Sequence, residues 1–87
     1  MNQNLYLQYA ALPVPRLDTE AVDEETYFEF LHLEAEIAGW YSRGDLSEEL
    51  TRTFTDRLRL IREKTSPDLD SEFRTSVGLL LDAVSFE

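Results

Sequence analysis

The stretch from Asp18 to Trp40, DTEAVDEETYFEFLHLEAEIAGW, decides the fold of this chain. Its apolar side chains recur at helical spacing in two adjoining rows. The first row, which Tyr41 continues, comprises Phe30, Leu33, Ile37 and Trp40, and the second comprises Tyr27, Leu31, Ala35 and Ala38. The remaining polar stripe is narrow and consists of Glu25, Glu29, His32 and Glu36. Because a helix that is apolar on most sides has to be covered on most sides, we expect a central helix over about residues 20–42.

Capping signals on both sides of this stretch place the helix ends. Asp18 or Thr19 is the expected N-cap, and Gly44 ends the helix. A second helix is expected over about residues 46–65, because Asp45 stands three residues before Glu48 as in a capping box. Its core stripe is Leu46, Leu50, Phe54, Leu58 and Ile61. A third helix is expected over about residues 67–85, with Ser66 as N-cap and Pro67 in the first turn.

Residues 1–16 form a separate piece that ends at Pro13 and Pro15. Leu5, Leu7 and Tyr9 alternate as in a strand, but a lone strand has no partner within this chain. We therefore expect an extended arm or a short helical turn across the bundle, and pairing with another chain is the alternative. The predicted fold is all-α: residues 17–87 form one domain, a small antiparallel three-helix bundle, and residues 1–16 form its N-terminal arm.

Length and composition exclude several classes of protein. With 87 residues and 43% hydrophobic residues, the chain fits one globular domain and not a disordered one. It has no cysteine, so it holds neither a disulfide nor a thiolate zinc site. The N-terminus lacks the features of a signal peptide, and no apolar run approaches a membrane span. We expect a cytoplasmic protein without a membrane partner.

The net charge of −10 is distributed unevenly along the chain. Residues 17–42 hold eight acidic side chains and no basic one, whereas residues 43–65 hold six basic and five acidic side chains. Such a charge repels nucleic acid, so direct DNA or RNA binding is not expected. Three interpretations remain open: a solvated face, pairing with the chain's own arginines, and a surface complementary to a basic partner.

Few motifs suggest a cofactor or a reaction. Glu29-x-x-His32 resembles the metal-binding pair of ferritin-like di-iron proteins, and LEAEIAGWYSRG (33–44) resembles the first helix of encapsulated ferritins. The chain has no second histidine to complete such a site, so no metal is expected. DLDSEF (68–73) resembles the attachment site of acyl carrier proteins, but Glu72 follows Ser71 where that family has leucine. With one histidine and no cysteine, the sequence offers no nucleophilic triad, and we expect neither a cofactor nor an enzyme.

The charge pattern favours a non-catalytic module that binds and neutralises a basic protein. Small acidic helical chains serve as toxin immunity proteins and as phage inhibitors that mimic nucleic acid, including anti-CRISPR proteins; this analogy rests on size and charge. The predicted partner-binding residues are Glu24, Glu25, Glu29, Glu36, Asp68, Asp70 and Glu72, with Tyr27 and Tyr41 as aromatic anchors. The alternative is a structural or adaptor subunit, such as a secretion chaperone or a small homodimer, whose acidic surface only keeps it in solution.

Overall fold

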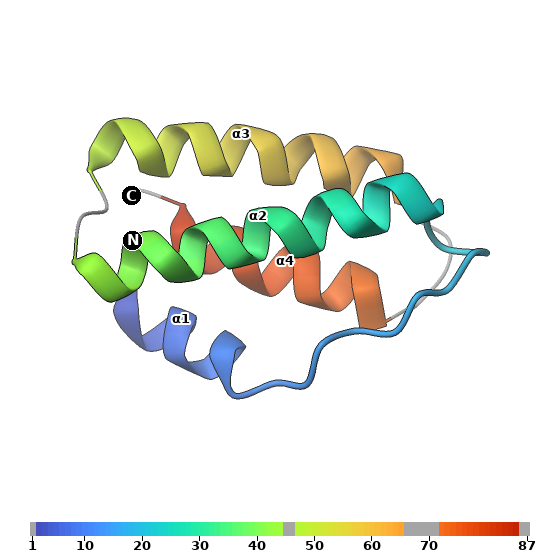
Figure 1. Cartoon of the computed structure of the whole chain (residues 1–87), viewed down its shortest axis with the longest axis horizontal. Coiled ribbons are helices and arrows are strands. Elements are labelled where there is room, and N and C mark those ends of the chain that lie inside the picture. Colours follow the sequence, from blue (N-terminus) through green and yellow to red (C-terminus); the bar gives the residue numbers. More distant parts are fainter. Residues whose placement is uncertain (1, 45–46, 66–71, 86–87) are drawn as a thin grey trace.

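A bundle of helices makes up the chain in the computed structural model, which describes residues 2–44, 47–65 and 72–85. The helices are α1 (Gln3–Ala10), α2 (Glu24–Arg43), α3 (Glu48–Lys64) and α4 (Glu72–Val84). In Figure 1, α2, α3 and α4 run lengthwise and reverse direction from each helix to the next, while α1 lies below one end of the bundle. Within the described residues the predicted all-α fold and antiparallel order are confirmed, with four helices in place of three because the arm contains a helix of its own.

The core lies where α2, α3 and α4 meet. Each helix contributes residues spaced three or four apart, so one stripe per helix faces inward. The fully or almost fully buried side chains include Phe30, Leu33 and Ile37 of α2, Phe54, Leu58 and Ile61 of α3, and Phe73, Val77 and Leu80 of α4. The rings of Phe30 and Phe73 meet edge to face at 5.1 Å between centroids, which locks α2 against α4.

Of the two forms expected for the arm, extended or short-helical, the structure shows the helical one over Gln3–Ala10. The buried side chains are Tyr6 and Tyr9, which are three residues apart as on one face of a helix, whereas Leu7 is exposed. Asn2 caps this helix by accepting a hydrogen bond from the Leu5 N–H. The Asn2 N–H donates to the Ala83 carbonyl at 2.8 Å, so the start of α1 is tied to the end of α4.

α2 begins later than the apolar pattern predicts. Its N-cap is Asp23, whose carboxylate accepts a hydrogen bond from the Thr26 N–H at 2.7 Å, and not Asp18 or Thr19. Residues 18–22 form a turn instead, in which the Asp18 carbonyl accepts from the N–H groups of Ala21 and Val22. The turn buries those two side chains, and this burial outweighs the continuation of the helix. At the other end Gly44 adopts φ +68°, as predicted for the helix stop.

The starts of α3 and α4 agree only partly with prediction. Ser47, and not Asp45, is the N-cap of α3, because its hydroxyl accepts from the Leu50 N–H at 3.2 Å. The described part of α4 begins at Glu72. The predictions for Leu46, Ser66 and Pro67 fall on positions outside the described residues.

Candidate protein-binding surface

The residues predicted to bind a partner lie in different settings. Glu24 and Glu25 are exposed in the first turn of α2, and Glu72 is exposed in the first turn of α4. Asp68 and Asp70 lie outside the described residues. The predicted set therefore includes freely exposed carboxylates as well as the internally paired and buried side chains described next.

Glu29 and Glu36 are paired with cations of the neighbouring helix. Arg57 of α3 contacts Glu36 at 2.9 Å, and Lys64 contacts Glu29 at 3.8 Å. Partly exposed pairs of this kind contribute about 0–1 kcal/mol each. Their larger effect is on the charge of the surface, since a cation of α3 compensates part of the negative charge of each carboxylate.

A third carboxylate of α2 is engaged inside the bundle, which the sequence did not indicate. The hydroxyl of Tyr9 donates a hydrogen bond to the Glu34 carboxylate and joins α1 to α2. Burial raises the pKa of Tyr9 strongly, and the hydrogen bond to Glu34 raises it further, so the hydroxyl keeps its proton. The signal in the sequence was that Glu34 stands among the apolar positions of α2, next to Leu33, but sequence alone does not place α1 and α2 together.

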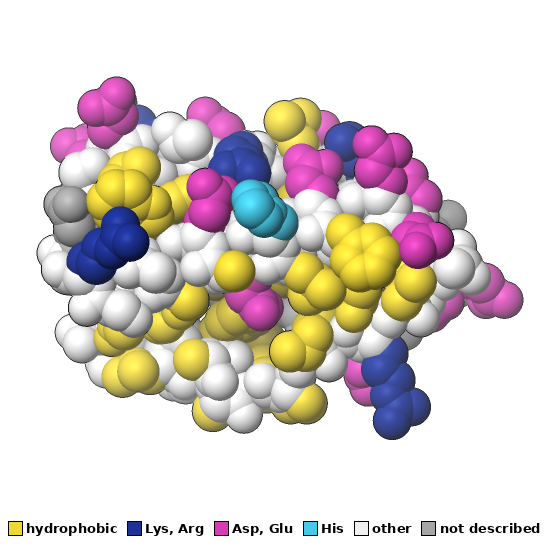
Figure 2. All heavy atoms as spheres, in the orientation of Figure 1, with side chains coloured by type: hydrophobic (Ala, Val, Ile, Leu, Met, Phe, Trp, Pro, Cys, Tyr) yellow, Lys and Arg dark blue, Asp and Glu magenta, His cyan; other side chains and the backbone are white. Residues whose placement is uncertain are grey.

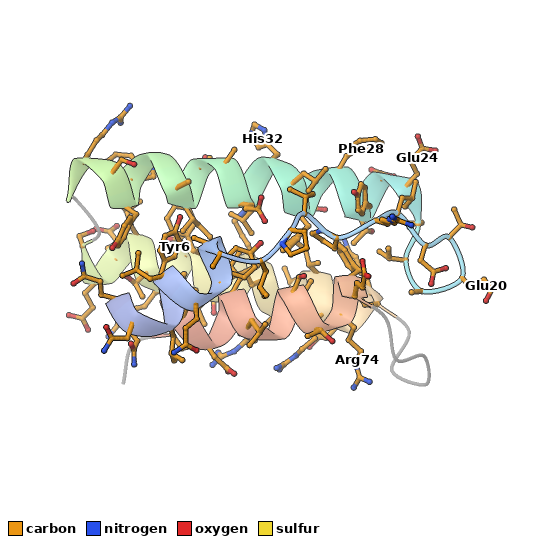
Figure 3. All side chains as sticks on the ribbon, turned by 90° about the horizontal axis from the view of Figure 1, so that it is seen from below. Tyr6, Glu20, Glu24, Phe28, His32 and Arg74 are labelled. Atoms are coloured by element: carbon orange, nitrogen blue, oxygen red, sulfur yellow. The ribbon has the colours of Figure 1, made fainter. Side chains whose placement is uncertain are left out.

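The carboxylates that remain form what we call the acidic end. It consists of Asp18, Glu20, Asp23, Glu24 and Glu25, all exposed. Among the described residues, no lysine or arginine forms an ion pair with any of them. Figure 3 shows Glu20 and Glu24 pointing outward at the same end of the molecule. The negative charge of residues 17–42 that has no ion pair is thus concentrated at residues 18–25.

Local hydrogen bonds fix the backbone of the acidic end. Asp18 accepts from the Glu20 N–H at 3.0 Å, and Asp23 caps α2. Hydrogen bonds from the side chain and then from the backbone N–H of Thr26 lower the pKa of Asp23 below its ordinary value. The positive end of the α2 dipole favours negative charge at this position. The backbone that carries Glu20, Glu24 and Glu25 is therefore held in place, while their side chains take no part in these hydrogen bonds.

Glu72 lies next to the acidic end although it belongs to another helix. A shallow surface depression brings its side chain together with those of the turn before α2. The lining residues are Arg16, Leu17, Asp18, Thr19, Glu20 and Glu72. Arg16 supplies a positive charge within this lining, and the charge of Lys64 on α3 also acts on Asp23, although it forms no ion pair with it.

The two predicted tyrosine anchors hold the bundle together. Tyr27 is buried, and its hydroxyl donates to the Pro15 carbonyl at 2.6 Å. Tyr41 stacks on Tyr6 with 4.3 Å between ring centroids, and its hydroxyl accepts from the Gln3 side chain at 3.1 Å. Both tyrosines thus attach the N-terminal residues to α2, and Tyr27 does not reach the surface.

The exposed aromatic ring beside the acidic end is Phe28, which the two predicted apolar rows omitted. Its side chain is 53% exposed, and Figure 3 shows it in the same outward row as Glu24 and His32. The spacing of four residues from Glu24 and from His32 was the signal in the sequence. In addition, Ala35 of the second predicted row is exposed, so this side of α2 is covered less than predicted.

Phe28 is one of four exposed apolar side chains on two neighbouring segments, which together we call the apolar strip. The strip consists of Leu12, Val14, Leu17 and Phe28, each of them exposed. In Figure 2, hydrophobic side chains gather along α2 and over the segment that joins α1 to α2, on the face that carries His32. The hydrogen bond from Tyr27 to Pro15 holds this segment beside the first turns of α2.

Neither a metal site nor a membrane-crossing helix is found in the described parts of the chain. No three of their histidine and acidic side chains come together in a group that could hold a metal ion. None of the helices in these parts combines the length and the apolar character needed to cross a bilayer.

Compared with protein-family models, with curated proteins and with solved structures, the chain shows no match in any of the three, so its function has to be argued from its own residues.

Proposed function

We propose that the chain is a non-catalytic protein-binding module that docks its acidic end onto a basic partner and thereby neutralises it. A toxin immunity protein and a phage inhibitor that mimics nucleic acid, such as an anti-CRISPR protein, are the classes that this mechanism fits. The single observation that supports the proposal is the absence, among the described residues, of any ion pair to the acidic end, while Glu29 and Glu36 are paired.

The physical reason is that uncompensated like charges repel one another and lower stability. A chain that placed its cations to balance this charge would remove the repulsion. Instead, four of the five cations of α3 form ion pairs with Glu36 and Glu29 of α2 and with Glu48 and Asp56 of α3 itself. The charge of Lys64 also acts on Asp23, but without an ion pair. A binding role explains the arrangement, because opposite potentials raise association rates by about 10- to 1,000-fold and select the partner.

The test compares two variants that change the net charge equally at different places. One is Glu24→Lys with Glu25→Lys in the first turn of α2, and its matched control is Glu48→Lys with Glu49→Lys in the first turn of α3. The wild-type chain is first used to capture partners from a lysate of the organism that encodes it, and the captured protein is then purified for kinetics.

We expect a basic partner whose association with the wild type slows steeply as salt is raised. The α2 variant should slow association by about tenfold or more, and the α3 control by much less, because steering depends on where the charge lies. A neutral partner, salt-independent binding, or equal effects of the two variants would contradict the proposal.

The structure also supports a second function, that of a structural or adaptor subunit. The exposed Phe28 and Ala35 leave part of α2 uncovered, as expected of a helix that another chain covers. Size-exclusion chromatography with light scattering distinguishes the two. A dimer that persists at low concentration favours the subunit, and a monomer favours the binding module.

A further inference from the structure

We infer that the apolar strip and the acidic end form one continuous docking surface, and that its occupant is a cationic amphipathic helix of the partner protein. This inference rests on the proposed function and deepens it, because it names the kind of segment that the partner presents.

Most of the exposed large apolar side chains come from two neighbouring segments, the one that joins α1 to α2 and the first turns of α2, which the hydrogen bond from Tyr27 to Pro15 holds together. The large hydrophobic side chains exposed in the described residues are Leu7, Leu12, Val14, Leu17, Phe28, Leu60 and Leu79. Four of these seven make up the strip, with exposed fractions from 38% to 60%. Single exposed hydrophobic residues are ordinary, whereas a contiguous apolar area marks an interaction surface.

Contacts within the chain hold the strip in place without a partner. Pro13 and Pro15 restrict the backbone of the joining segment. Pro15 is buried and accepts the hydrogen bond of Tyr27 at 2.6 Å. The ring of Phe28 meets that of Tyr27 edge to face at 5.5 Å between centroids. A surface fixed in this way loses little conformational entropy when it binds.

Charged side chains lie at the edge of the strip. Glu24 lies one helical turn before Phe28 on the outward row, and Glu20 lies at the same end of the molecule (Figure 3). Leu17 is followed directly by Asp18, and both line the depression that includes Glu72. The surface therefore presents an apolar area whose edge carries several carboxylates and the cation Arg16, so its charge is mainly negative.

The charges at the edge of the strip favour one kind of occupant over another. A second copy of the chain would bring carboxylates opposite carboxylates, and each copy carries a net charge of −10. A helix with an apolar stripe flanked by lysines and arginines matches both features, since its stripe covers Phe28 and Val14 while its cations reach the acidic end. Charge complementarity thus favours a basic helix over self-association.

The probe for the test is a synthetic helical peptide with a leucine stripe and lysines on either side of it. A scrambled peptide of the same composition keeps the charge and loses the stripe. Both are titrated by calorimetry into the full-length chain, into Phe28→Gln, and into the matched control Leu60→Gln, which changes a side chain of similar exposure on α3. Circular dichroism verifies that each variant is folded.

We expect the striped peptide to bind at least about tenfold more tightly than the scrambled one. Phe28→Gln should lower the affinity for the striped peptide about tenfold, and Leu60→Gln should leave this affinity unchanged. Glu24→Gln with Glu25→Gln should weaken both peptides and reduce the salt dependence.

Three results would overturn the inference, and they differ in what they mean for the proposed function. Equal binding of both peptides with no effect of Phe28→Gln would show that charge alone acts, and the proposed function would stand. Self-association of the wild type that Phe28→Gln abolishes, in analytical ultracentrifugation, would make a second copy the occupant. Absence of binding by either peptide would count against the inference and the proposed function together.

Discussion

The first turns of α2 and α3 carry the same pair of side chains, Glu24 and Glu25 in one and Glu48 and Glu49 in the other, directly after a capping residue. Their surroundings differ. Glu48 is met four residues later by Arg52 at 2.9 Å, on a helix that also carries Arg57, Arg59, Arg62 and Lys64. Glu24 and Glu25 are followed by an aromatic and apolar sequence with no base before Arg43. Similar helix starts thus give a balanced surface on α3 and an unbalanced one on α2.

The difference lies in the outer faces of the two helices, since both bury an apolar stripe. The cations of α3 pair partly with Glu48 and Asp56 of α3 and partly with Glu36 and Glu29 of α2. α2 depends on aromatic contacts on its inner face, and its outer row, with Glu24, Phe28 and His32, contributes little to the core. A helix anchored from one side in this way leaves its outer row available for binding.

The largest expected effect tests that separation of the two faces of α2. Phe30→Ala should lower the free energy of unfolding by about 3–5 kcal/mol, because it removes a fully buried ring that packs on Phe73. Phe28→Ala should cost about 1 kcal/mol or less, since its ring is half exposed and touches mainly Tyr27. Urea unfolding followed by circular dichroism measures both. Comparable losses would show that the outer row is structural and would remove the basis for a free binding surface.

The capping residues give a smaller effect that depends on pH. Ser47→Ala should lower the stability by about 1 kcal/mol at every pH, because a serine hydroxyl does not titrate. The carboxylate of Asp23 has a pKa lowered below its ordinary value of 3.8 by the hydrogen bonds from Thr26. Its contribution is therefore complete above that value and is lost as the pH falls through the lowered pKa.

Thermal unfolding between neutral pH and about pH 2.5 measures this contrast. Asp23→Ala should reduce the melting temperature at neutral pH, and the difference from wild type should shrink as the solution is acidified below the ordinary pKa of aspartate. The Ser47→Ala difference serves as the control and should persist. A penalty for Asp23→Ala that is the same at both ends of the pH range would contradict the role of its carboxylate as the cap.

The smallest expected effect compares two single carboxylates of α2: Glu36, which forms an ion pair, and Glu25, which forms none with the described residues. Glu36→Gln should lower stability by up to about 1 kcal/mol in low salt, because it removes the pair with Arg57, and by less in high salt. Glu25→Gln should change stability by about 0.5 kcal/mol at most, since attraction to the helix dipole and repulsion by neighbouring carboxylates oppose each other. If both variants lost equal stability and responded equally to salt, Glu25 would have a cation of its own and the acidic end would be compensated.

Much of the fold followed from local patterns. The first apolar row of α2, the stop at Gly44 and the stripe from Leu50 to Ile61 each depend on residues within a few turns of one another, and each agrees with the structure. The second apolar row agrees only in part, since Tyr27 is buried and Ala35 is exposed. The start of α2 was missed because Asp18 and Asp23 are both good capping residues. The burial of Ala21 and Val22 decides between them, and that burial depends on the rest of the bundle.

The candidate site was less predictable for the same reason. Tyr27 and Phe28 are neighbours of similar character, yet one is buried against Pro15 and the other is exposed. Which of them points inward is set by the rotation of α2 about its own axis, and contacts with α4 and with the joining segment fix that rotation. Glu29 and Glu36 were selected on charge, and their pairing with α3 could not be inferred from spacing within α2.

The amino-acid sequence by itself determined that this chain is helical, where its longest helices lie, and that residues 17–42 hold eight carboxylates without a base. Those properties arise from backbone hydrogen bonds and side-chain periods that span only a few residues. Only the tertiary structure decided that three of these carboxylates are engaged by other helices, that five are left at one end, and that Phe28 stands exposed beside them. Such outcomes depend on distances between residues that are far apart in the chain, and these distances exist only after the helices have packed.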